Sequence, residues 1–87
     1  MALDFLNDAR SYDASRQCVS FWGYDAAFEV TFRLDQSALS LFAGEATLSE
    51  TIALKAFDAN VVQIRKAARK HYKGLQHRYL EMSSKDM

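Results

Sequence analysis

Proline is absent from this 87-residue sequence, which also has only three glycines and one cysteine, Cys18. A lone cysteine cannot form a disulfide within its own chain, so we expect a reducing, cytoplasmic environment. Three isolated glycines cannot build the Gly-rich loop that cradles a nucleotide phosphate, so we expect no nucleotide cofactor. With so little proline and glycine, the composition is that of a folded domain and not of a disordered linker.

Long hydrophobic runs are also missing. No apolar stretch approaches the roughly 20 residues that cross a bilayer, and the start, MALDFLNDAR, lacks the basic and apolar regions of a signal peptide. Hydrophobic residues make up 49% of the chain and no linker or repeat interrupts it, which is typical of a globular domain. We expect one small domain over residues 1–87, in the cytoplasm and without a membrane partner.

The net charge is zero, but the charges are distributed unevenly. Up to and including Asp58 the chain has nine acidic and four basic residues, whereas the remainder has two acidic and seven basic residues. Strong nucleic-acid binders are usually basic overall, so the zero net charge argues against a dedicated one. The basic second part still allows a basic binding face.

The stretch CVSFWGYDAAFEVTFRL, residues 18–34, has the alternation of two half-buried strands joined by a tight turn. If Asp25 and Ala26 form a two-residue loop, the apolar residues of both strands share one face, and a slip of one residue would scramble both faces. Asp-Gly would suit such a turn better than Asp-Ala, so the turn type stays open. The expected cross-strand pairs are Phe21–Val30, Val19–Phe32, Trp22–Glu29, Ser20–Thr31 and Cys18–Arg33.

Shorter elements flank this hairpin. The Asp and Ser residues near 13–16 predict a turn, preceded by a short strand around residues 9–12. Asp35 is a suitable N-cap for a helix over QSALSLFA that ends at Gly44. The C-terminal stretch HRYLEMS alternates again and predicts a last strand.

The second helix is predicted to be long. TLSE has the form of a capping box, with Thr47 as the N-cap and Glu50 three residues on, and Gly74 is a C-terminal stop. One narrow apolar stripe runs along this helix: Leu54, Phe57, Val61, Ile64, Ala68 and Tyr72. The sequence therefore predicts an α+β fold in the order (β)ββααβ, with one short and one long helix packed on one face of a small antiparallel sheet of three to four strands.

The polar face of the hairpin carries the only tryptophan in the chain. Trp22 and Tyr24 lie there with Glu29 and Arg33, and tryptophan, tyrosine and arginine are the residue types enriched at interface hot spots. We expect these four residues to form a protein interface. The alternative is that the apolar N-terminal segment, residues 3–6, folds across this face and covers it.

The polar side of the long helix carries a basic ridge, RKAARK followed by a further lysine. Such a ridge can contact nucleic-acid phosphates. It can also be a solvated face whose cations complement the C-terminal end of the helix macrodipole, and the zero net charge favours this plainer interpretation. The candidate nucleic-acid contacts are Arg65, Lys66, Arg69, Lys70 and Lys73.

The sequence has no recognisable catalytic motif. It lacks a Gly-x-Ser-x-Gly elbow, a Cys-x-x-Cys pair and a His-Glu-x-x-His motif. Cys18, which we expect beside Arg33 with a modestly lowered pKa, and His77 are available for chemistry, but nothing else supports an enzyme. His71 and His77 straddle the end of the helix in a spacing that no familiar metal site uses. We expect no catalytic residue, metal or cofactor.

A set of residues along the chain forms a further pattern: Tyr12-Asp13, Val19, Phe21-Trp22-Gly23, Asp25, Phe57-Asp58, Asn60, Ile64, Ala68 and Tyr72. With the closing SSKDM, this pattern resembles a family of short bacterial proteins known only as a domain of unknown function. The likeness covers nearly the whole chain, and Ala26 departs from it where the family would favour glycine. The resemblance implies a compact α+β domain of bacterial origin and brings no assigned activity or site residue.

These observations favour a small, non-enzymatic cytoplasmic module for binding or assembly. We expect it to bind protein, as a second copy or another chain, through the face with Trp22 and Tyr24 or through an exposed strand edge. The alternative is an accessory nucleic-acid-binding regulator that uses the basic face of the long helix.

Overall fold

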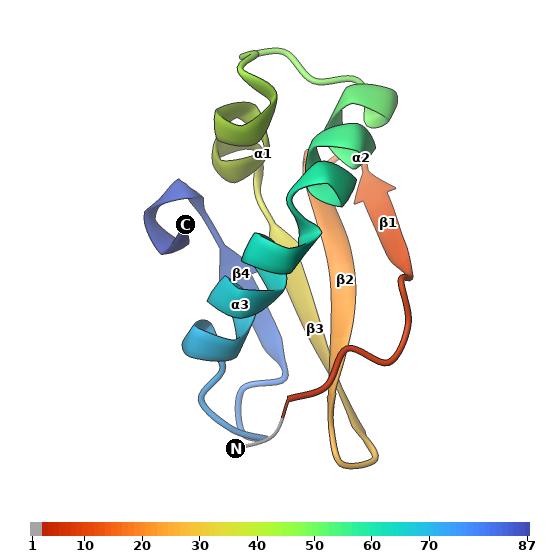
Figure 1. The fold of residues 1–87 in the computed structure, drawn as a ribbon, viewed down its shortest axis with the longest axis vertical. Coiled ribbons are helices and arrows are strands. Elements are labelled where there is room, and N and C mark those ends of the chain that lie inside the picture. Colours follow the sequence, from red (N-terminus) through yellow and green to blue (C-terminus); the bar gives the residue numbers. More distant parts are fainter. Residues whose placement is uncertain (1–2) are drawn as a thin grey trace.

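The computed structural model describes residues 3–87, which form an α+β fold as the sequence predicted. Figure 1 shows the helices in one layer, packed on one face of the sheet. The predicted short first strand and last strand are both present. The described residues form β1 (Arg10–Asp13), β2 (Cys18–Asp25), β3 (Phe28–Leu34), α1 (Gln36–Ala43), α2 (Glu50–Ala59), α3 (Val61–His71), β4 (Tyr79–Met82) and the short 3₁₀ helix η1 (Ser84–Asp86).

The strand order is β1-β2-β3-β4, and the first three strands are antiparallel neighbours. β4 runs parallel to β3, so the sheet is mixed, which corrects the predicted antiparallel arrangement for this last pair. The reason lies in the connection, because α1, α2 and α3 carry the chain across the sheet before β4 begins. A helical crossover brings a strand back in the same direction, whereas a tight hairpin reverses it.

The hairpin of β2 and β3 keeps the predicted faces, but its register differs by two residues. The loop is Ala26-Ala27, and Ala26 has the positive φ, 55°, that the first loop position of a type II′ turn requires. Asp25 stays in β2, where its carboxylate accepts a hydrogen bond of 2.6 Å from the Tyr72 hydroxyl. A shift of two preserves both faces because side chains alternate with a period of two. The observed pairs are Val19–Leu34, Ser20–Arg33, Phe21–Phe32, Trp22–Thr31, Gly23–Val30, Tyr24–Glu29 and Asp25–Phe28.

Helix α1 begins and ends as the sequence predicted. The Asp35 side chain accepts a hydrogen bond of 3.2 Å from the backbone N–H of Ala38, which caps the first turn. Gly44 adopts a left-handed conformation with φ 72°, which lets the chain leave the helix without steric strain.

The predicted long helix is two helices, α2 and α3, with a break at Asn60. The Asn60 side-chain amide donates to the carbonyl of Ala56 at 2.8 Å, and its backbone has φ −121° and ψ 17°. Asparagine side chains compete in this way with the hydrogen-bond ladder of a helix, which explains the break. α2 begins after Ser49, whose hydroxyl accepts the N–H of Ile52 at 3.2 Å, so the predicted N-cap at Thr47 is wrong.

The core lies between the helix layer and the inner face of the sheet. The predicted apolar stripe faces the sheet in spite of the break, and Phe57 and Ile64 in it are buried. The rings of Phe21 and Phe32 stack with their centroids 5.2 Å apart, and Phe57 lies 5.2 Å from Phe21. Burial of these side chains supplies the main driving force for this arrangement of layers.

Candidate functional site

The outer face of the sheet is not covered by any element of residues 3–87. The helices α1, α2 and α3 all lie on the inner side (Figure 1), where the large apolar residues of β2, β3 and β4 point. The alternation along each strand therefore places the other half of the side chains on the opposite face, which has no helix against it. This outer face comprises Ser11, Asp13, Cys18, Ser20, Trp22, Tyr24, Glu29, Thr31, Arg33, Tyr79 and Glu81.

The predicted interface residues are brought together on this face. Trp22 lies opposite Thr31 and not opposite Glu29 as predicted, and it is half-buried among its strand neighbours. The Tyr24 hydroxyl donates a hydrogen bond of 3.2 Å to the Glu29 carboxylate, its actual cross-strand partner. Arg33 shares the same face, in the row of Ser20. The hypothesis of an aromatic patch bordered by charges is therefore consistent with the positions of all four side chains.

Two residues of this face were missed in the sequence. Tyr79, which is 75% exposed, lies opposite Thr31, and Glu81 lies opposite Arg33. The row Trp22–Thr31–Tyr79 thus runs across β2, β3 and β4. The alternation in β4 already placed Tyr79 and Glu81 on one face, but the strand beside which they lie depends on the parallel β3–β4 pairing, which no local pattern signals.

The N-terminal segment does not cover this face, so the alternative interpretation is wrong for the described residues. Asp4 pairs with Tyr24 through backbone hydrogen bonds of 2.9 and 2.7 Å, which places the segment beside the edge of β2. Leu3 is buried in the core. A Cβ atom added to Gly23 would lie only 3.1 Å from side-chain atoms of Leu3 and Phe5. The missing side chain of Gly23 therefore makes room for this segment on the inner side.

The five predicted nucleic-acid contacts, in α3 and just after it, divide into two groups. Arg65 donates to the carbonyl of Asn7 and to the carboxylate of Asp8, both at 3.1 Å. Arg69 donates to the carbonyl of Leu3 at 3.2 Å. Both guanidinium groups also lie over the ring of Phe5, 5.3 and 5.1 Å from its centroid, a favourable cation–π geometry. Two of the five predicted nucleic-acid contacts thus hold the N-terminal segment in place.

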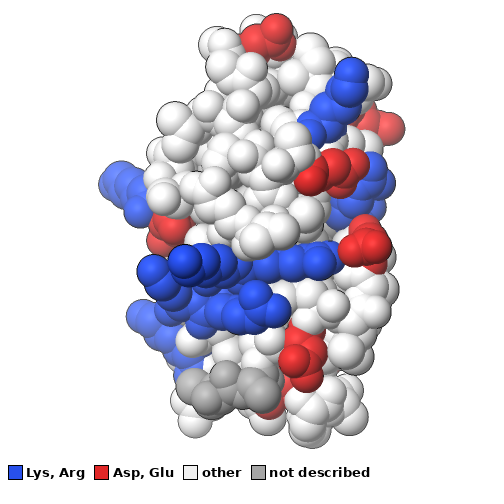
Figure 2. Space-filling view, viewed as in Figure 1, with Lys and Arg blue, Asp and Glu red and all other residues white. Residues whose placement is uncertain are grey.

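The other three predicted contacts, Lys66, Lys70 and Lys73, are exposed, and within residues 3–87 they make no ion pair. Figure 2 shows Lys and Arg side chains gathered in a band across the helix side of the molecule. This band lies on the opposite side of the molecule from the aromatic row. The two surfaces that the sequence suggested are therefore separate.

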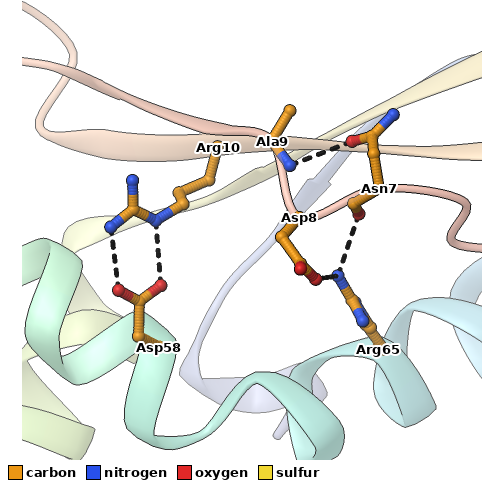
Figure 3. A network of polar contacts seen from close by, with 6 residues as sticks. All are labelled: Asn7, Asp8, Ala9, Arg10, Asp58 and Arg65. Atoms are coloured by element: carbon orange, nitrogen blue, oxygen red, sulfur yellow. Dashed lines mark hydrogen bonds and ion pairs between the residues drawn. The ribbon is translucent and has the colours of Figure 1, made fainter.

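A shallow pocket of about 420 Å³ separates the start of β1 from α2 and α3. Arg10 donates two hydrogen bonds, of 2.9 and 2.8 Å, to the carboxylate of Asp58, and Asp8 pairs with Arg65 (Figure 3). The Arg10 hydrogen bonds lower the pKa of Asp58 below its ordinary value. The charged groups of this pocket neutralise one another in two ion pairs. These pairs hold the N-terminal strand region against the helices.

Cys18 is buried, with 4% of its surface exposed, and its pKa is raised. Burial is the main cause, and the negative charge of Asp13, its partner in register, adds to it. The opposing effect of Arg33 is smaller, so the predicted lowering of this pKa is wrong. Burial explains the error, because it disfavours the thiolate more than Arg33, which lies opposite Ser20, favours it.

The histidines do not converge with other ligand types. His71 Nδ1 lies 3.5 Å from the carboxylate of Asp86, which ties η1 to the end of α3. Within residues 3–87 no three His, Cys, Asp or Glu side chains are placed to share a metal ion. None of the helices in that range is long and apolar enough to span a membrane.

The fold has a known structural counterpart. A crystal structure at 1.60 Å resolution of a protein of unknown function from Shewanella loihica PV-4, of the DUF1488 family, superposes with a TM-score of 0.76 at 16% identity. The match covers 93% of this chain and 91% of that one. No curated protein matches the chain. The model of the family described as "Protein of unknown function (DUF1488)" matches residues 3–80, and the chain therefore belongs to this family, as the sequence resemblance implied.

Proposed function

We propose that this protein is a non-enzymatic, cytoplasmic protein-binding module that acts through the outer face of its sheet. The observation that carries the proposal is the aromatic row Trp22–Thr31–Tyr79, which crosses β2, β3 and β4 on the side without helices. Tyr79 is 75% exposed, so most of its aromatic side chain is accessible to a partner.

The chemistry of this face suits a protein partner. Tryptophan and tyrosine bury a large apolar area at little conformational cost and keep a polar atom for a hydrogen bond. Glu29, Arg33 and Glu81 surround the aromatic row with charges of both signs. Such mixed charge complements a polar interface rim, whereas a phosphate backbone would require a surface of one sign.

The test compares matched substitutions on the two sides of the molecule. Trp22→Ala and Tyr79→Ala remove the aromatic row, while Val62→Ala removes an apolar side chain that is 80% exposed on α3. We expect Trp22→Ala and Tyr79→Ala to abolish co-purification of bound protein from the source cells, and Val62→Ala to leave it unchanged. Equal recovery of the same bound protein by wild type and Trp22→Ala would refute the proposal.

A second candidate, nucleic-acid binding, is supported by the exposed lysines Lys66 and Lys70 of α3 and Lys73 just after it. Because Arg65 and Arg69 hold the N-terminal segment, we expect any such binding to be weak and lost with modest salt. An anisotropy titration at low salt tests it, with Lys66→Ala/Lys70→Ala as the variant. A flat titration at low salt would eliminate this candidate.

A further inference from the structure

The two edges of the sheet are protected to different degrees. At the β1 edge, Arg10 reaches to Asp58 of α2, and charged side chains on an edge strand discourage pairing with other strands. β4 has the sequence YLEM, with Glu81 as its single charged residue and no proline, lysine or arginine, whereas β1 has a charged residue at each end; within residues 3–87 no strand lies beyond β4. The β4 edge is therefore the one open to a further strand.

Two residues of β4 have backbone N–H and C=O groups that point away from β3, toward the open edge. The carbonyl of Arg78 accepts from Thr31 of β3 at 2.7 Å, and that of Met82 accepts from Asp35 at 2.9 Å. Because a strand alternates the direction of its backbone groups, those of Tyr79 and Glu81 point away from β3. These are the groups that a pairing strand would engage.

The side chain of Leu80, between Tyr79 and Glu81, is also incompletely covered. Leu80 faces the inner side with Phe32 and Met82, but it is only half-buried, whereas Phe32 has no exposed surface and Met82 has 1%. Leu80 differs because the sheet ends at β4, so one flank of this side chain has no neighbour. A strand added at this edge would cover that flank.

We infer that β4 pairs antiparallel with β4 of a second copy, with Leu80 at the symmetry axis. In this register Tyr79 of one copy exchanges backbone hydrogen bonds with Glu81 of the partner subunit. The inner faces of both sheets then lie on the same side. A register with Glu81 at the symmetry axis would place Glu81 against Glu81 of the partner subunit, which charge repulsion disfavours. The chosen register sets each Tyr79 hydroxyl beside a carboxylate instead.

This inference rests on the proposed function and enlarges the surface that it uses. Pairing through β4 joins the two outer faces into one continuous surface, on which each Trp22–Thr31–Tyr79 row continues into Glu81 and Arg33 of the partner subunit. A pair of four-residue strands buries much less than a standard interface of about 1,600 Å². The dimer is therefore weak and forms at high protein concentration.

Glu81→Pro tests the inference selectively. Proline at position 81 removes an N–H that points to the open edge and leaves the β3–β4 hydrogen bonds intact, since proline is tolerated at such positions of edge strands. Glu81→Ala is the matched control, because it removes the same carboxylate and keeps the N–H. The readouts are sedimentation equilibrium over a wide concentration range and, by NMR, exchange of the Tyr79 and Glu81 amides.

We expect the average mass of wild type and Glu81→Ala to rise toward that of a dimer with concentration, while Glu81→Pro stays monomeric. In wild type the Tyr79 and Glu81 amides should become protected as the dimer forms, a readout that needs no variant to fold. A wild type that stays monomeric, or a dimer that forms equally in Glu81→Pro with both amides unprotected, would overturn the inference. The outer-face proposal would then still depend on the Trp22→Ala result alone.

Discussion

On the inner side of β3, Val30 and Phe32 have no exposed surface, whereas on the outer side of the same strand Glu29 is exposed and Thr31 is half-buried. The same backbone thus supports two surfaces with different constraints. The inner surface is fixed by packing against three helices of the described chain, whereas the outer one has no helix against it and is the surface that we propose for a partner. The comparison teaches that polar alternation alone does not distinguish a binding surface from a solvated one; our proposal rests on an outer-face side chain that solubility does not require, Trp22.

The largest expected effect is the difference in stability loss between a substitution on the inner face and one on the outer face. Phe32→Ala leaves a cavity where its ring stacks on Phe21, and we expect a loss of about 3–5 kcal/mol in the free energy of unfolding. Thr31→Ala, one residue away on the outer face, should cost under about 1 kcal/mol. Urea denaturation of both variants measures the difference. Similar losses for the two would contradict the assignment of the faces.

Gly23→Val tests the inner face with the opposite change in volume. The added side chain would overlap Leu3 and Phe5, which already lie 3.1 Å from the position of a Cβ atom, so we expect a loss of about 1–3 kcal/mol. Amide exchange at Asp4 and Tyr24 should accelerate, because the N-terminal segment is displaced. The control is Ser20→Val, on the outer face of the same strand, which should change stability by no more than about 0.5 kcal/mol.

Tyr72→Phe tests the polar contact on the inner side through its pH dependence. Burial, with the neighbouring Asp25 carboxylate, raises the pKa of Tyr72 from 10.0 to about 12. The folded state therefore favours the neutral phenol, so its contribution is complete below pH 10 and is lost as the pH rises toward 12. We expect the fall in stability across this window to be smaller in Tyr72→Phe, as measured by urea denaturation at several alkaline pH values.

The exposed Tyr79 of the outer face provides the control for that experiment. Tyr79→Phe should retain the alkaline fall in stability seen in wild type, because the Tyr72–Asp25 contact is unchanged in this variant. If Tyr72→Phe and wild type lose stability in parallel above pH 10, the Tyr72–Asp25 contact does not contribute as described.

The parts of the fold that the sequence predicted depend on local patterns. The strand faces follow from alternation, and the ends of α1 follow from Asp35 and Gly44, whose chemistry acts within one turn. The predicted hairpin register was wrong because two registers that differ by two residues place the same side chains on each face. The contact that favours the observed one, Tyr72 with Asp25, joins positions far apart in the chain.

The remaining errors have comparable causes. The break at Asn60 depends on a side-chain hydrogen bond to Ala56 that a capping-box and periodicity argument ignores. The candidate site was predicted in part: Trp22 and Tyr24 were found from one hairpin, but Tyr79 joins them only through the parallel pairing of β4. Likewise, the use of Arg65 and Arg69 by the N-terminal segment depends on tertiary contacts.

The central claim is that the outer face of the sheet is a protein-binding surface, and Trp22 reports on it directly because it is the only tryptophan. The measurement is Trp22 fluorescence, by emission maximum and acrylamide quenching, for the dilute protein and for the protein in complex with its co-purified partner. The account predicts that association shifts the emission to the blue and reduces quenching. A complex that forms while both quantities stay unchanged would contradict it.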